Sequence, residues 1–117
     1  MASPGFAFSV IGINHGHIYG QVQVMQQAGC RLKAFFAPED DLAAEFSKAF
    51  PEAKRVSDER AVLDDTEIKL IVGAGILDER APMAVRAMRA GKDVMLDKPG
   101  ATSLEQLAEL RRTQAES

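Results

Sequence analysis

The stretch "SVIGINHGHIYGQ", residues 9–21, contains the first residues whose types and spacing suggest chemistry. An apolar run, Phe6 to Ile13, precedes it, and a helical pattern follows. Dinucleotide-binding turns between a strand and a helix read G-x-G-x-x-G, which lets a pyrophosphate approach the backbone. This chain has Gly12-x-Asn14-x-x-His17, so only the first glycine is in register. The stretch is compatible with a cofactor turn at a helix N-terminus and also with a structural loop that binds no ligand.

His15 and His17 surround Gly16, and a His-x-His pair after a first strand also suggests a metal site. Hydrolases that use such a pair are built on barrels of about 250 residues, which is longer than this chain. These are the only histidines, and Cys30 is the only cysteine, so no Cys/His cluster completes a coordination shell. We therefore predict no metal, and we expect both histidines to cap the helix or contact a cofactor.

A second candidate is the segment Asp97-Lys98-Pro99, which follows the short apolar run "DVML". A lysine at the carboxyl end of a parallel strand, beside a carboxylate and a proline, can present its ammonium to a substrate oxygen or assist proton transfer. The alternative is a surface lysine in a loop. We predict Lys98 as the catalytic residue.

Alternating patterns predict the elements that position these residues. Runs typical of buried strands lie at Phe6–Ile13, Arg31–Ala37, Ala53–Ser57, Ile68–Gly75 and Lys92–Asp97. Helical patterns lie at Ile18–Ala28, Asp41–Phe50, Ser57 or Asp58 to Leu63, Glu79–Ala90 with Pro82 in its first turn, and Ser103–Glu116 with a Ser-x-x-Gln capping box. This alternation predicts an α/β fold, a doubly wound and mainly parallel sheet in the Rossmann-like order 3-2-1-4-5. Residues 1–117 then form a single domain.

Composition excludes several classes of protein. Of the 117 residues, 46% are hydrophobic and 26% charged, and the net charge is −3, which favours neither nucleic acid nor an anionic membrane as a partner. No apolar run reaches the roughly 18 residues of a membrane span. A single cysteine fits a reducing compartment, so we expect a cytoplasmic protein.

The stretch "AMRAGKDVMLDKPGATSLEQLAEL", residues 87–110, resembles the Gfo/Idh/MocA family. Members typically read A-G-K-H-V-x-x-E-K-P at this place, followed by small residues and a helix. The resemblance implies the N-terminal, NAD(P)-binding half of a two-domain oxidoreductase that acts on sugars, cyclitols and related polyols. It also implies that Lys98 lies near the nicotinamide and the substrate hydroxyl, with Asp97 in place of the usual glutamate.

The resemblance assigns cofactor contacts to both loops and to the lysine segment: Gly12, Asn14, His15, Gly16, His17, Gly75, Ile76, Asp97 and Lys98. The family's acid at the end of the second strand, which holds the adenosine ribose, is Ala37 here, and Glu39 or Asp40 are the candidate substitutes. Nothing basic lies between Ala34 and Ser47 to hold a 2′-phosphate, so NAD is preferred over NADP.

These departures from the family pattern leave a second function class open, a non-catalytic Rossmann-like binding or sensor domain with weakened dinucleotide affinity. Family sheets continue with a sixth strand, and the substrate pocket comes largely from a C-terminal domain. We expect both to be missing from this chain, which would then be a fragment without activity alone. We also expect a homodimer through the exposed fifth strand or the last helix.

Overall fold

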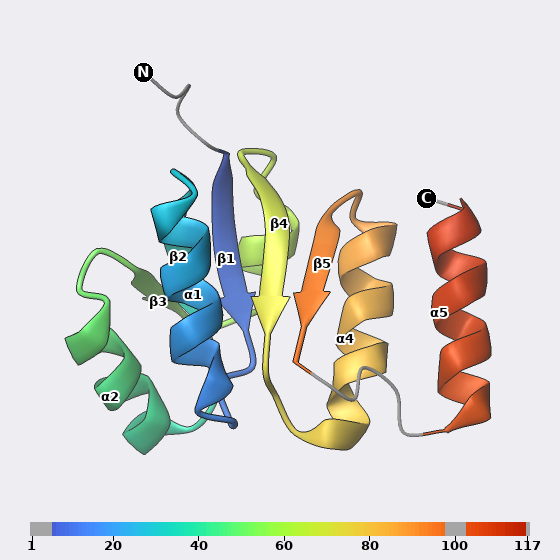
Figure 1. Cartoon of the computed structure of the whole chain (residues 1–117), viewed down its shortest axis with the longest axis horizontal. Coiled ribbons are helices and arrows are strands. Elements are labelled where there is room, and N and C mark those ends of the chain that lie inside the picture. Colours follow the sequence, from blue (N-terminus) through green and yellow to red (C-terminus); the bar gives the residue numbers. More distant parts are fainter. Residues whose placement is uncertain (1–5, 98–102, 117) are drawn as a thin grey trace.

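The computed structural model describes residues 6–97 and 103–116, and Lys98 therefore lies outside the described residues. Strands and helices alternate along the chain, as Figure 1 shows. The strands are β1 (Ala7–Ile11), β2 (Arg31–Phe36), β3 (Lys54–Val56), β4 (Ile68–Gly73) and β5 (Asp93–Leu96). The helices are α1 (His17–Gln27), α2 (Asp40–Ala49), α3 (Arg60–Leu63), α4 (Leu77–Arg89) and α5 (Leu104–Glu116).

The five strands form one parallel sheet in the order β3-β2-β1-β4-β5, which confirms the predicted fold class and strand order. The order reverses at β1, whose neighbours are β2 on one side and β4 on the other. The carboxyl ends of these central strands meet at one edge of the sheet, where ligands bind in folds of this kind.

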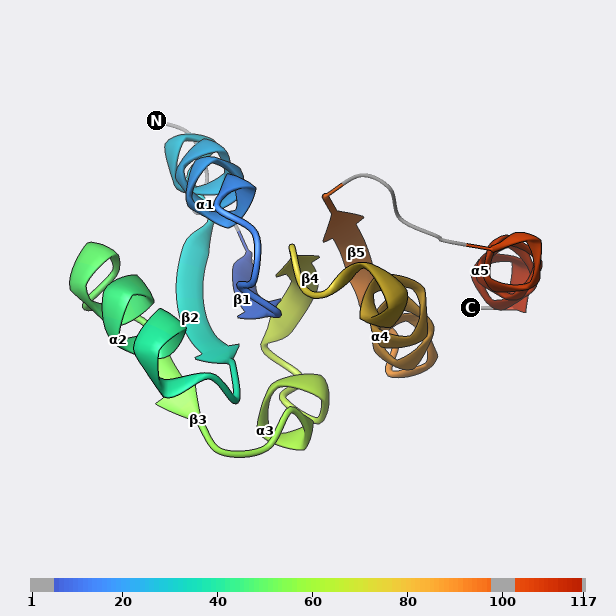
Figure 2. The ribbon, with the colours of Figure 1, turned by 90° about the horizontal axis from the view of Figure 1, so that it is seen from below.

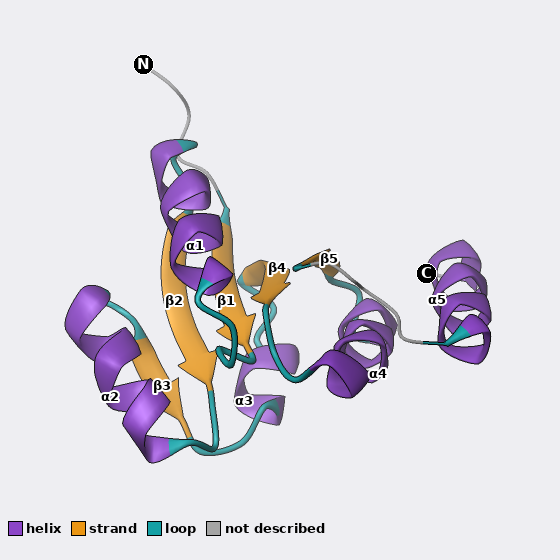
Figure 3. Ribbon diagram, turned by 60° about the horizontal axis from the view of Figure 1, so that its bottom comes forward, coloured by secondary structure: helices purple, strands orange, loops and turns teal. Residues whose placement is uncertain are grey.

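Helices cover both faces of the sheet (Figures 2 and 3). Phe8 and Val10 of β1 pack with residues of α1 and α2, among them Val22 and Phe46. Ile11, on the opposite face of β1, packs with residues of α3 and α4. Because both faces are buried, β1 and β4 consist almost entirely of buried residues, which explains their continuous apolar sequences.

Helix α4 begins two residues earlier than its pattern predicts, so the prediction that Pro82 lies in its first turn is wrong. A proline inside a helix cannot donate to the carbonyl four residues earlier, here that of Asp78. Nε2 of Gln106 in α5 donates to the Asp78 oxygen at 3.1 Å instead. Ser103 caps α5 as predicted, since its Oγ accepts from the Gln106 N–H at 3.1 Å. Gln106 therefore joins the two helices.

The strand β5 pairs with β4 on one side and, within the described ranges, with no strand on the other. The helix α5 packs against α4, beyond the β5 edge of the sheet (Figure 1). Of the helices in the described part of the chain, none is both long and apolar enough to span a membrane.

Candidate functional site

The two loops that follow β1 and β4 are joined by backbone hydrogen bonds at the switch point of the sheet. The Ala74 N–H donates to the Gly12 oxygen at 3.0 Å, and the His15 N–H donates to the Ala74 oxygen at 2.9 Å. The Gly12 N–H donates to Phe36 at the end of β2, at 3.3 Å. These bonds fix the first loop against its neighbours, with the N-terminus of α1 at the same edge of the sheet.

The close approach of the loops after β1 and β4 requires a glycine at position 12. Its φ is +92°, which L side chains rarely adopt, and a Cβ built there would lie 2.8 Å from the Gly75 Cα. Gly16 directly precedes α1, and a Cβ built there would meet nothing within 4 Å, so the space beside this residue is open. The first glycine of the motif thus has its expected structural role, and the Gly12–Gly75 contact leaves backbone at the cleft surface.

A pocket of about 220 Å³ opens beside these loops, toward the carboxyl end of β2. Four predicted cofactor residues line it: Gly12, Asn14, Gly75 and Ile76. Glu39 lines it too, and its Oε2 accepts from Nδ2 of Asn14 at 2.9 Å. The other oxygen, Oε1, is buried and accepts no hydrogen bond from the part of the chain that the structure describes. A buried carboxylate oxygen of this kind suits a ligand hydroxyl.

The sequence analysis missed two arginines near this pocket. Arg86 of α4 makes a bidentate pair with Glu59 across the pocket wall, with Nε–Oε1 and Nη2–Oε2 distances of 2.6 and 3.2 Å. Arg55 of β3 donates through Nη2 to the Ala37 oxygen and to Asp40, both at 2.9 Å. The sequence between Ala34 and Ser47 contains no basic residue, as stated above, but Arg55 reaches the end of β2 because β3 pairs with β2.

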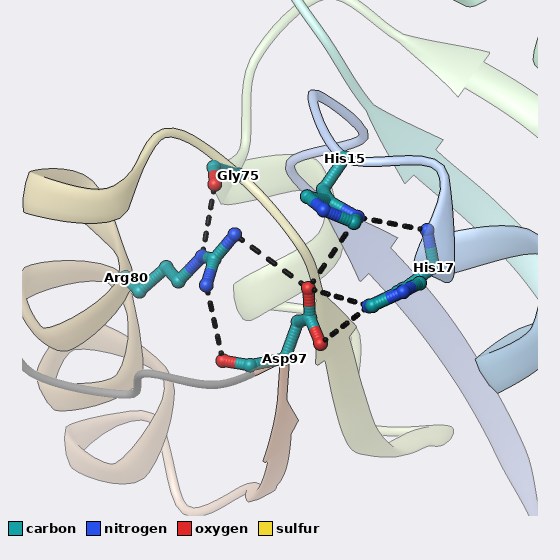
Figure 4. A network of polar contacts seen from close by, with 5 residues as sticks. All are labelled: His15, His17, Gly75, Arg80 and Asp97. Atoms are coloured by element: carbon teal, nitrogen blue, oxygen red, sulfur yellow. Dashed lines mark hydrogen bonds and ion pairs between the residues drawn. The ribbon is translucent and has the colours of Figure 1, made fainter.

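On the other side of the switch point, three cationic or polar side chains lie around the Asp97 carboxylate (Figure 4). Its carboxylate lies 3.1 and 3.2 Å from Nδ1 of His17 and 3.6 Å from Nδ1 of His15. Nη2 of Arg80 is 3.7 Å from the same carboxylate. The Asp97 side chain is 11% exposed, whereas His15 and His17 are 49% and 69% exposed, so the histidines form the outer wall of the cluster.

Arg80 is the inner member of this cluster and is only 3% exposed. Its Nε donates to the Gly75 oxygen at 2.9 Å, and its Nη1 donates to the Asp97 oxygen at 3.3 Å. A buried guanidinium needs such partners to offset its lost hydration. Arg80 therefore ties the loop after β4 to the end of β5. Nothing in the sequence spacing of Arg80 indicated this role.

His15 caps α1, because its Nδ1 accepts the His17 N–H at 3.1 Å. The prediction of no metal rested on the lack of a third ligand, and the structure brings Asp97 to both histidines, with one ligand atom from each residue within 4.8 Å. Two of these ligand atoms already have partners, however. Nδ1 of His15 accepts the His17 N–H, and the Asp97 carboxylate is paired with Arg80. The absence of a metal stays a prediction.

A comparison with family models matches residues 6–117 to the oxidoreductase family with an NAD-binding Rossmann fold, Gfo/Idh/MocA. The chain belongs to this family. It is the NAD-binding Rossmann domain of a family oxidoreductase, as the resemblance of residues 87–110 predicts. A search of curated proteins finds no match.

Solved structures agree on the fold. A candidate oxidoreductase from Erwinia carotovora atroseptica SCRI1043 is 37% identical, with a TM-score of 0.92, over 95% of this chain and 33% of that one. Biliverdin reductase from Synechocystis sp. PCC 6803, in complex with biliverdin and NADP+, is 22% identical, with a TM-score of 0.80 over 95% and 35%. Myo-inositol 2-dehydrogenase from Lactobacillus plantarum is 18% identical, with a TM-score of 0.79 over 96% and 33%. The chain thus spans about a third of the length of these proteins.

Proposed function

We propose that this chain is the NAD-binding half of an oxidoreductase that transfers a hydride between nicotinamide and a hydroxyl-bearing carbon of a sugar, cyclitol or related polyol. The observation that carries the proposal is the Gly12–Gly75 approach beside a pocket that Asn14 and Glu39 line. Bound there, the dinucleotide would supply the hydride acceptor or donor.

The residues of the cleft divide between the two halves of such a cofactor. The pocket beside β2 suits the adenosine half, with Glu39 and Asn14 toward the ribose hydroxyls and an apolar floor that includes Ile11 and Met83. The pyrophosphate would lie over Gly12 and Gly16, beside the N-terminus of α1. The nicotinamide half would then reach the cluster around Asp97, next in sequence to the predicted catalytic Lys98.

Within this proposal NAD is preferred over NADP. Glu39 offers an acceptor to ribose hydroxyls and would repel a 2′-phosphate. Arg55 is held by Asp40 and by the Ala37 carbonyl, and Arg86, which lines the pocket, is paired with Glu59. An arginine engaged in this way is less available to a phosphate.

We further propose that the protein is cytoplasmic and that the 117-residue chain, by itself, transfers no hydride to polyols. The lack of activity is supported by the length of the chain, which spans about a third of its structural neighbours, and the location by its single cysteine, which fits a reducing compartment. In this proposal the pocket and the cluster described above form the cofactor side of the site, while the family resemblance implies that substrate-holding groups come largely from a C-terminal domain.

The second candidate function is a binding or sensor domain with weak dinucleotide affinity. One observation favours it: the first amides of α1 already have partners within the chain. The His17 N–H donates to the His15 ring at 3.1 Å, and the Ile18 N–H donates to the His15 oxygen at 3.2 Å. An anion at this terminus would therefore compete with bonds that exist without it.

Titration of NADH fluorescence with the purified chain distinguishes the two functions. We expect saturable binding that Gly12→Ala abolishes, since a Cβ at this positive φ collides with Gly75. Gly20→Ala is the matched control, because its Cβ meets no atom within 4 Å and alanine favours a helix. Circular dichroism verifies that both variants fold. No binding of NADH or NADPH at millimolar concentration would favour the sensor domain.

A further inference from the structure

We propose that His17 is a second acid–base residue of the site, with Asp97 as the group that orients it; this rests on the proposed oxidoreductase function. In the family resemblance the partner acid or base comes largely from a C-terminal domain. This chain brings an imidazole and a carboxylate together at its own cleft, from segments 80 residues apart in sequence.

The geometry is that of an oriented acid–base pair. Nδ1 of His17 lies 3.1 and 3.2 Å from the two carboxylate oxygens of Asp97, so it carries a proton and donates it to a carboxylate. Asp97 is nearly buried, while the His17 side chain is 69% exposed. Nε2, across the ring from Nδ1, is thus the atom that this exposed imidazole can offer to a ligand at the carboxyl edge of the sheet. A buried carboxylate that fixes the tautomer and orientation of an exposed imidazole is the arrangement that histidine bases use.

Arg80 fixes the carboxylate in turn. Its guanidinium lies 3.7 Å from Oδ2 and also donates to the Asp97 backbone oxygen, while Nε holds Gly75. Rotation of the Asp97 carboxylate away from His17 would therefore also break its ion pair with the buried Arg80 guanidinium, which opposes that rotation. Arg80 is a positioning residue: it acts through Asp97 and lies behind it, away from the exposed ring (Figure 4).

His15 provides an internal contrast. Its Nδ1 accepts the His17 N–H at 3.1 Å, so this nitrogen is unprotonated and the neutral ring carries its proton on Nε2. The two histidines, two residues apart, therefore have opposite tautomers. Only His17 presents an unprotonated Nε2, and His15 serves as the cap that shapes the turn.

The reaction step balances with this assignment. During oxidation of a secondary alcohol, Nε2 of His17 would take the hydroxyl proton, while the bound dinucleotide would supply the hydride acceptor. A carbonyl forms, and the imidazole becomes an imidazolium paired with Asp97. In the reverse direction the same imidazolium returns the proton to the carbonyl oxygen. Lys98, as predicted, would stabilise that oxygen while its charge changes.

Nitrogen-15 NMR of the 117-residue chain tests the pair without any cofactor. When both rings are neutral, we expect the Nδ1–H form for His17 and the Nε2–H form for His15. Asp97→Ala should abolish the Nδ1–H form of His17, while Asp93→Ala, a control at the opposite end of the same strand, should leave it unchanged. The same Nε2–H form for both histidines in the native chain would overturn the proposal.

Diethyl pyrocarbonate gives a second readout, because it acylates an unprotonated imidazole nitrogen. We expect His17 to react faster than His15, and NADH to protect it, with the modified ring located by mass spectrometry. Equal rates for the two histidines, or a His17 rate unchanged in Asp97→Ala, would also overturn the pair. NADH binding with a failed tautomer test would leave the cofactor site intact, so the two proposals fail separately.

Discussion

Glu39 is the single residue on which the cofactor preference depends. Its free oxygen would accept from the adenosine ribose, and a hydrogen bond to a charged group contributes about 1.5–3 kcal/mol. Glu39→Ala should therefore weaken NADH binding about 10- to 100-fold. NADPH should lose less affinity or gain some, since the repulsion of its 2′-phosphate disappears. Parallel fluorescence titrations with both nucleotides measure the change in their ratio.

Glu45→Ala is the control for this change, because Glu45 is exposed on α2 in the same part of the chain and does not line the pocket. An equal loss for NADH and NADPH in Glu39→Ala would contradict the ribose assignment, as would an unchanged NADH affinity.

At the scale of elements, a charge cluster joins β2 to the loop before β4, at the end of the sheet opposite the cleft. Nζ of Lys33 lies 2.5 Å from Oδ2 of Asp65 and 3.0 Å from Oε1 of Glu67. Hydrogen bonding from Lys33 lowers the pKa of both carboxyls from their ordinary values of 3.8 and 4.5. A depressed pKa in the folded state stabilises the fold above the ordinary pKa, and this contribution is lost as the pH falls through the folded value.

Lys33→Gln should therefore lower the free energy of unfolding slightly at neutral pH, and the difference from the native chain should be smaller at about pH 3, below the ordinary pKa of both carboxyls. The cluster is partly exposed to solvent, so the effect should also shrink in high salt. Urea denaturation at the two pH values measures it, with Lys54→Gln on exposed β3 as the control. A difference that is the same at both pH values would show that packing, and not charge, is responsible.

The elements themselves follow from local patterns, whereas the site follows only partly. Buried runs such as Ala7–Ile11 and turn residues such as Gly12 carry signals that hydrophobic periodicity and backbone sterics make readable. The pairing of His17 with Asp97 depends on how β1 and β5 flank β4. Arg55 reaches the end of β2 only because two strands pair. Such contacts between distant segments leave no mark in the spacing of either segment.

For the whole molecule, β5 lies at the edge of the sheet, and Leu104 and Leu107 of α5 are 84% and 39% exposed. Unpaired backbone groups on an edge strand template pairing with another chain, and exposed leucines favour association. We expect concentration-dependent dimers in light scattering. Leu104→Glu should weaken them if α5 forms the contact, with Glu105→Gln as the control. A strict monomer at all concentrations would contradict the expectation.

The most direct test of the account is a map of NADH onto the folded chain. Titration of the nitrogen-15-labelled protein, followed through its backbone amide signals, locates the ligand residue by residue. We predict the largest shifts at Gly12, Asn14, His15, Gly75 and Ile76, with none at Thr66 and Gly91 at the opposite edge of the sheet. Shifts centred on that opposite edge, or no shifts at millimolar NADH, would contradict the proposal that the switch-point cleft binds the cofactor.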